Sequence, residues 1–221
     1  MGRKKILDRK VMGIPYYFPY ILYIVLFLCA RLVCKQEYGE HQTALLYEMG
    51  IPFFMSWWAV YSLYDYLEEE GGIVLFTYRK NMPYFVLRTN LYLTFKYMIL
   101  SGIYMLLSMY FLFGKEDIPI LVCIMTEIIF FSSAAFFLMG CLSDSNWTLM
   151  LLFVYVCAEY FTNGEILGSL NIFLFQYDGI TWWDVFDHVL KCILFSVVLY
   201  VAGVTLIKNH RKIHQLFFKI K

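Results

Sequence analysis

The stretch SLYDYLEEEGGIVLFTYRKNMPYFVLRTN, residues 62–90, gathers three glutamates, two glycines and an Arg-Lys pair between two long apolar runs. The 221-residue chain around it is 61% hydrophobic and only 16% charged, whereas soluble domains are about 45–50% apolar and about 25% charged. This composition predicts an integral membrane protein. A net charge of +1 creates no overall field that would attract nucleic acid, so the position of each charge matters more than the sum.

On both sides of this stretch the apolar runs are long enough to cross a bilayer, which takes about 20 mostly apolar residues. We therefore expect an all-α fold in which residues 1–221 form a single transmembrane domain. The six predicted transmembrane helices cover residues 14–34, 44–64, 91–113, 119–142, 147–163 and 189–207. Six crossings place both termini on the same side of the membrane.

The lysine and arginine content of the connections predicts the orientation of these helices. The N-terminal arm, the 62–90 connection and the C-terminal tail are rich in basic residues, whereas the three connections on the opposite side contain only Lys35 and Lys115. The positive-inside rule then predicts a multi-pass protein of the cell membrane with both termini in the cytoplasm. The basic, amphipathic residues 2–10 predict an N-terminal interfacial helix on the inner leaflet, and the tail at 210–221 has the same character.

The last outer connection, residues 164–188, is neither a clean span nor a polar loop. Its apolar part, ILGSLNIFLF, is too short to cross a bilayer and is interrupted by Asp178 and Gly179. Such pieces are typical of re-entrant segments. We expect an outer hairpin before the sixth span, with Trp182 and Trp183 at the level of the lipid headgroups.

Three carboxylates fall inside the predicted spans: Glu48, Glu127 and Glu159. Counting along antiparallel helices places Glu127 and Glu159 at a similar depth. Charged groups in a bilayer are costly and usually face the bundle interior or a wet cavity. We expect these carboxylates to line a translocation path; the alternative is a hydrogen bond to Ser, Thr or Tyr of a neighbouring helix.

Motifs for catalysis and cofactor binding are missing from the sequence. The six cysteines are scattered singly, and the four histidines fall in predicted loops or in the tail, away from any partner. There is no spacing typical of metal ligands and no Gly-Lys-Ser/Thr loop that would hold phosphates. We expect neither an enzyme nor a bound metal or cofactor, and an intramembrane protease is the least favoured alternative.

The order of these features resembles the permease subunit of type-2 ABC exporters, the ABC-2 family. The segment YLEEEGGIVLFTYRKNMPYFVLRTNLYL is similar to that family's connection after the second span, and residues 130–156 and the outer hairpin are similar to its later part. The family's usual Thr-Leu after the glycine is replaced here by Gly-Ile. The positions that match are Glu69 or Glu70, Gly71 or Gly72, Ile73, Leu75 and Pro83.

The resemblance implies a cytoplasmic coupling helix between the second and third spans. A helix through the glutamates would end at the two glycines, and an apolar turn flanked by basic residues would follow it as a docking surface. The residues expected to contact the ATPase are Glu68, Glu69, Glu70, Gly71, Gly72, Ile73, Leu75, Arg79 and Lys80. The alternative is a solvated interfacial helix with its charges in water.

The resemblance also implies the partners and the activity. We expect two ABC ATPase subunits, which would carry ATP and magnesium, and a second permease copy or a sister permease in the lipid bilayer. The expected cargo is amphipathic: an antimicrobial peptide, a lipid or a drug. The competing hypothesis is a membrane sensor or scaffold that binds a partner through the same connection without transporting anything.

Overall fold

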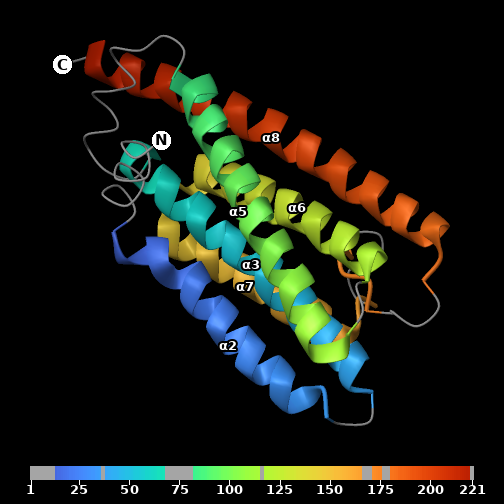
Figure 1. Cartoon of the computed structure of the whole chain (residues 1–221). Helices are drawn as coiled ribbons and strands as arrows, with labels where there is room; N and C mark the ends of the chain where they lie inside the picture. Colours follow the sequence, from blue (N-terminus) through green and yellow to red (C-terminus); the bar gives the residue numbers. More distant parts are fainter. Residues whose placement is uncertain are drawn as a thin grey trace.

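The computed structural model describes residues 13–35, 38–67, 82–114, 117–165, 171–175 and 180–219. Over these residues it contains a short 3-10 helix and six α-helices, and no strand. Figure 1 shows that successive α-helices run in opposite directions, so that the start of α2 and the end of α8 lie at the same end of the bundle. The helices are η1 (Ile14–Tyr17), α2 (Phe18–Val33), α3 (Gly39–Leu67), α5 (Met82–Phe113), α6 (Ile118–Leu142), α7 (Ser145–Thr162) and α8 (Trp182–Lys219).

Four of these helical segments are long and apolar enough to cross a membrane: Ile14–Val33, Met82–Phe113, Ile118–Leu142 and Trp182–Asn209. The prediction of an all-α membrane protein is confirmed at this level. The helices α3 and α7 also coincide with predicted spans but fall outside this set. A total of six crossings therefore remains a prediction.

The third predicted span is longer than expected, because α5 begins at Met82 rather than at residue 91. Met82, Val86 and Asn90 are buried at spacings of four and continue the buried face of the helix into its polar first turns. Pro83 lies in the first turn, where its missing N–H costs no helical hydrogen bond. Packing rather than hydropathy sets this boundary.

The sixth predicted span is also longer, and part of the predicted hairpin is wrong. Residues 182–188 form the first turns of α8, which continues without a break through the predicted tail helix to Lys219. Thr181 and Asp184 bond reciprocally: the Thr181 N–H and hydroxyl donate to Asp184 Oδ2 at 3.0 and 2.7 Å, and the Asp184 N–H donates to the Thr181 hydroxyl at 3.4 Å. This capping box fixes the start of α8. Residues 171–175 are not helical, and the rest of the hairpin lies outside the described residues.

The helices α6 and α7 are joined by two residues. Ser143 ends α6 in the left-handed conformation, with φ of 51°, and its N–H donates to the Met139 carbonyl. Asp144 caps α7 by accepting a hydrogen bond from the Trp147 N–H at 3.0 Å. The two helices therefore form a tight antiparallel hairpin.

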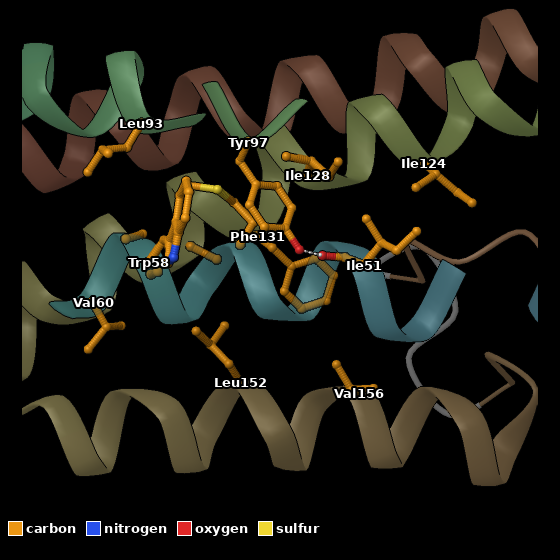
Figure 2. Packing of buried hydrophobic residues seen from close by; sticks show 14 of the residues in the cluster. Ile51, Trp58, Val60, Leu93, Tyr97, Ile124, Ile128, Phe131, Leu152 and Val156 are labelled. Atoms are coloured by element: carbon orange, nitrogen blue, oxygen red, sulfur yellow. Dashed lines mark hydrogen bonds between the residues drawn. The ribbon is translucent and has the colours of Figure 1, made fainter. Parts of the chain in front are cut away.

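The core lies around α3 and α6. The helix α3 packs against α2, α5, α6 and α7, and α6 packs most extensively against α8. Figure 2 shows Trp58 and Ile51 of α3 between Phe131 and Ile128 of α6 and the side chains of α7. The hydroxyl of Tyr97 on α5 donates to the Ile51 carbonyl at 2.7 Å, which adds a polar tie to this apolar packing.

Candidate functional site

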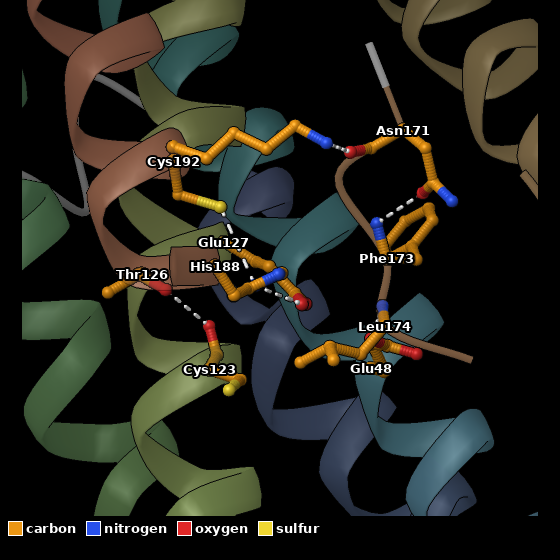
Figure 3. A network of polar contacts seen from close by, with 10 residues as sticks. Glu48, Cys123, Thr126, Glu127, Asn171, Phe173, Leu174, His188 and Cys192 are labelled. Carbon is orange, nitrogen blue, oxygen red and sulfur yellow. Dashed lines mark hydrogen bonds and ion pairs between the residues drawn. The ribbon is translucent and has the colours of Figure 1, made fainter. Parts of the chain in front are cut away.

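Three titratable side chains from three helices meet in the interior of the bundle. Glu48 lies on α3, Glu127 on α6 and His188 on the second turn of α8. Their side chains are 1%, 0% and 8% exposed. The prediction that His188 lies in a loop is wrong, because the capping box extends α8 upstream of it. Figure 3 shows the Glu127 side chain beside the His188 ring, and Glu48 beside Leu174.

The contacts within this acid–histidine cluster are short. His188 Nε2 lies 3.1 Å from Glu127 Oε1. Among the described residues, neither oxygen of the Glu127 carboxyl has a hydrogen-bond partner. A buried carboxyl of this kind is costly unless it shares a proton or a cation with its neighbours.

The non-helical segment 171–175 is attached to this cluster. The Leu174 N–H donates to Glu48 Oε1 at 2.6 Å, and the Lys191 ammonium donates to the Asn171 carbonyl. Phe173 is 3% exposed and its ring stacks on Phe131 with centroids 5.8 Å apart. The segment is thus held against the core by one acidic side chain, one basic side chain and one aromatic side chain.

Glu159 of α7 is the third carboxylate singled out from the sequence. Its side chain is buried, and neither carboxyl oxygen has a hydrogen-bond partner among the described residues. All three carboxylates singled out from the sequence are therefore buried inside the bundle. That they line a translocation path stays a prediction.

The chemistry open to the cluster is limited by its geometry. Cys192 Sγ lies 3.5 Å from His188 Nε2, the same ring nitrogen that contacts Glu127. A Cys-His-acid triad needs the thiol and the carboxylate on different ring nitrogens, so this arrangement does not form one. Among the described residues no group of three His, Cys, Asp or Glu side chains could hold a metal ion.

A hollow of about 550 Å³ is lined by Asn171, Leu174 and Phe175 of segment 171–175, together with His41 and Asn163. Leu174 lines the hollow, and its N–H donates a hydrogen bond to Glu48. Segment 171–175 therefore borders both the hollow and the acid–histidine cluster.

A second polar cluster ties α5 to α6 and α8 nearer the other end of the bundle. The Ser132 hydroxyl lies 2.6 Å from the Thr94 hydroxyl and 3.4 Å from Asn90 Oδ1, and it accepts a hydrogen bond from the Tyr200 hydroxyl at 2.9 Å. Ser132, Thr94 and Asn90 are buried. We call Asn90, Thr94, Ser132 and Tyr200 the serine network.

Sequence reasoning missed His188 and Lys191 as members of the site. The available signal was the pattern TWWD at residues 181–184, a Thr followed three residues later by an acid, which marks a helix start. A helix from residue 182 places His188 and Cys192 four residues apart on one face. The contact of His188 with Glu127 depends on the packing of α8 against α6, which no local pattern shows.

The residues expected to contact an ATPase lie at 68–81, outside the described residues, as does the predicted N-terminal helix at 2–10. Comparison with family models, with curated proteins and with solved structures finds no match. Membership of the ABC-2 family therefore remains a proposal.

Proposed function

We propose that the chain is the permease subunit of an ABC-2-type exporter, which moves an amphipathic cargo using the ATPase activity of separate subunits. It would cross the membrane six times with both termini in the cytoplasm, and would pair with a second permease copy or a sister permease. The cargo class, an antimicrobial peptide, lipid or drug, rests on the family resemblance. The observation that carries the proposal is the length and anchoring of the two helices that flank residues 68–81.

Both flanking helices are longer than a bilayer requires. The helix α3 has 29 residues and α5 has 32. At 1.5 Å per residue they measure about 44 and about 48 Å, against about 30 Å for the hydrocarbon core. Helices of this length would extend beyond the membrane, and residues 68–81 connect the end of α3 to the start of α5 at the end of the bundle where α8 ends (Figure 1). Two rigid helices can transmit a force applied to that connection.

The α5 helix is fastened to the rest of the bundle close to this connection. The Tyr66 and Phe85 rings meet edge to face with centroids 6.1 Å apart, which joins the end of α3 to the start of α5. Two turns further along α5, the serine network joins it to α6 and α8. A movement of residues 68–81 would therefore shift α6 and α8 together with α5, as an exporter driven from the cytoplasm requires.

Co-purification tests the proposal directly. The protein, extracted from its native membrane in mild detergent, is expected to bring down an ABC ATPase. The double variant Glu70→Arg, Gly71→Pro is expected to lose that ATPase and to abolish export or resistance while still being inserted. Glu165 is an exposed acid in the turn that follows α7, away from residues 68–81. The variant Glu165→Arg is therefore the matched control and should behave as the wild type.

Two results would contradict the proposal that an ATPase drives the chain. If no ATPase accompanies the wild-type chain, or if the double variant exports normally, the chain is not driven through residues 68–81. Capture of a different partner that depends on Glu70 and Gly71, without any transport, would instead favour the sensor or scaffold hypothesis.

A further inference from the structure

We propose that the hollow bordered by segment 171–175 is a binding site for a neutral sugar. The volume of about 550 Å³ falls within the range of about 300–1,000 Å³ that small-molecule sites occupy. This inference does not depend on the proposed export function, because it concerns a site within the chain. Three separate parts of the chain supply the described lining residues: His41 in the first turn of α3, Asn163 at the end of α7, and Asn171, Leu174 and Phe175 of the segment.

The chemistry of the lining residues indicates the class of ligand. None of the described lining residues is an acid, a lysine or an arginine, so the site offers an ionic ligand no counter-charge to offset its desolvation. The carboxamides of Asn163 and Asn171 each carry donors and an acceptor, which suits a hydroxyl group, itself both donor and acceptor. Leu174 and Phe175 are the apolar lining residues, and a sugar ring presents a C–H face that packs on such residues. A neutral ring with several hydroxyl groups matches both kinds of lining residue.

The wall that the segment contributes to the hollow is fixed by hydrogen bonds within the chain. The Asn171 Oδ1 atom accepts the Phe173 N–H at 2.9 Å (Figure 3), and the Asn171 carbonyl accepts a hydrogen bond from the Lys191 ammonium. The Leu174 N–H donates to Glu48 Oε1 at 2.6 Å. A wall that is already ordered lowers the entropic cost of binding.

Two of the lining residues have backbone conformations that most side chains avoid. Asn163 and Phe175 have φ of 46° and 52°, in the left-handed region. Asparagine tolerates this region at a helix end, but an aromatic residue there is strained. The ring of Phe173 meets the ring of Phe175 with centroids 5.8 Å apart and holds it in this position. Strain of this kind, maintained by surrounding contacts, is typical of ligand clamps.

Saturation-transfer NMR on the full-length protein tests the site. The protein is purified in a polyoxyethylene detergent, because a detergent with a maltoside or glucoside head group would itself compete for the site. The probes are the free sugars glucose, galactose, N-acetylglucosamine and maltose. At least one of them should give a saturable signal, whereas glucuronate, which is negatively charged, should give none.

A dissolved sugar and the head group of a glycolipid share this chemistry, and a second experiment distinguishes them. The protein is placed in phosphatidylcholine nanodiscs with and without a glycolipid that carries the sugar found to bind. Displacement of the free sugar by the glycolipid supports a site for a lipid head group. Undiminished binding of the free sugar supports a site for a dissolved sugar.

Variants of the lining residues locate the binding. Asn163→Gly removes one carboxamide but keeps the left-handed end of α7, which glycine adopts without strain. The dissociation constant should rise roughly fivefold, the effect of losing one hydrogen bond. Phe175→Gly removes the ring and the strained φ, and it should also weaken binding. Asn209→Ala, at an exposed position of α8, is the control and should bind as the wild type.

Three results would overturn the proposal. These are the absence of a saturable signal from every neutral sugar, tighter binding of glucuronate than of any neutral sugar, and wild-type binding by Asn163→Gly. If Phe175→Gly does not fold, Asn163→Gly decides, because Asn163 is exposed and its replacement disturbs no described side-chain contact. Circular dichroism checks that this variant is folded.

Discussion

Replacing Ser132 with alanine should destabilise the bundle by about 2 kcal/mol. The change removes three hydrogen bonds to other helices: those with Thr94, Asn90 and Tyr200. Interhelical hydrogen bonds in membrane proteins contribute about 0.6 kcal/mol each on average, which yields about 2 kcal/mol for the three. The loss of one hydroxyl group leaves no cavity large enough to add substantially to this value.

Ser133 is a matched control on the next residue of the same helix. It is as fully buried as Ser132, but its hydroxyl donates only to the Phe130 carbonyl within α6, at 2.7 Å. Ser133→Ala should therefore change the free energy of unfolding by less than about 0.5 kcal/mol, since no contact between helices is lost. The difference between the two variants isolates the bonds between helices from the effect of removing a hydroxyl.

Unfolding in mixed micelles with increasing denaturing detergent, followed by circular dichroism, measures both variants. A double-mutant cycle with Tyr200→Phe should give a coupling energy of about 0.6 kcal/mol with Ser132→Ala, because both changes break the same bond. If Ser132→Ala and Ser133→Ala are equally stable, or if the coupling energy is zero, the serine network does not tie α5 to α6 and α8. A movement of α5 would then not be transmitted to α6 and α8 through these hydrogen bonds.

Three further predictions concern packing and helix ends, and the same unfolding assay checks them. Gly203→Ala should lower the free energy of unfolding by about 1–3 kcal/mol, because a Cβ there would lie 2.6 Å from a ring carbon of Phe136. Gly102→Ala is the control and should be neutral or stabilising, because its Cβ would have no atom closer than 3.9 Å. Equal effects of the two changes would contradict close packing of α8 on α6. Tyr97→Phe should cost about 1 kcal/mol through loss of its bond to a carbonyl of α3, and an unchanged midpoint would show that the bond contributes nothing. Thr181→Ala should cost about 1 kcal/mol and increase hydrogen exchange in the first turn of α8 alone; protection equal to that of the wild type would exclude the capping box.

The positions of the helices could largely be predicted from hydropathy, but their ends could not. The predicted start of the third span at residue 91 excluded Arg88, Thr89 and Asn90 because of their polarity. In the folded chain Asn90 is buried, and its side chain bonds to Ser132 across the helix interface. A polar residue that finds a partner on another helix lowers local hydropathy without ending its own helix.

Only some residues of the candidate site could be predicted from the sequence. Glu48, Glu127 and Glu159 were singled out because an acid in an apolar run is conspicuous. His188 and Lys191 were not, because Asp184 and Asp187 make their surroundings resemble a loop. Whether these residues meet depends on the packing of α8 against α6 and on the path of segment 171–175, which are properties of the tertiary structure.

The two-residue turn between α6 and α7 has a consequence for synthesis and insertion. With Ser143 and Asp144 as the whole connection, α7 cannot leave the translocation machinery far from α6. The helix α7 carries Glu159 and falls outside the set of helices that are long and apolar enough to cross a membrane, so we expect it to enter the bilayer as the second arm of a hairpin led by the strongly apolar α6. A cut or a long insertion at this turn should therefore impair the insertion of α7 more than that of α5, α6 or α8, which are apolar enough to cross alone.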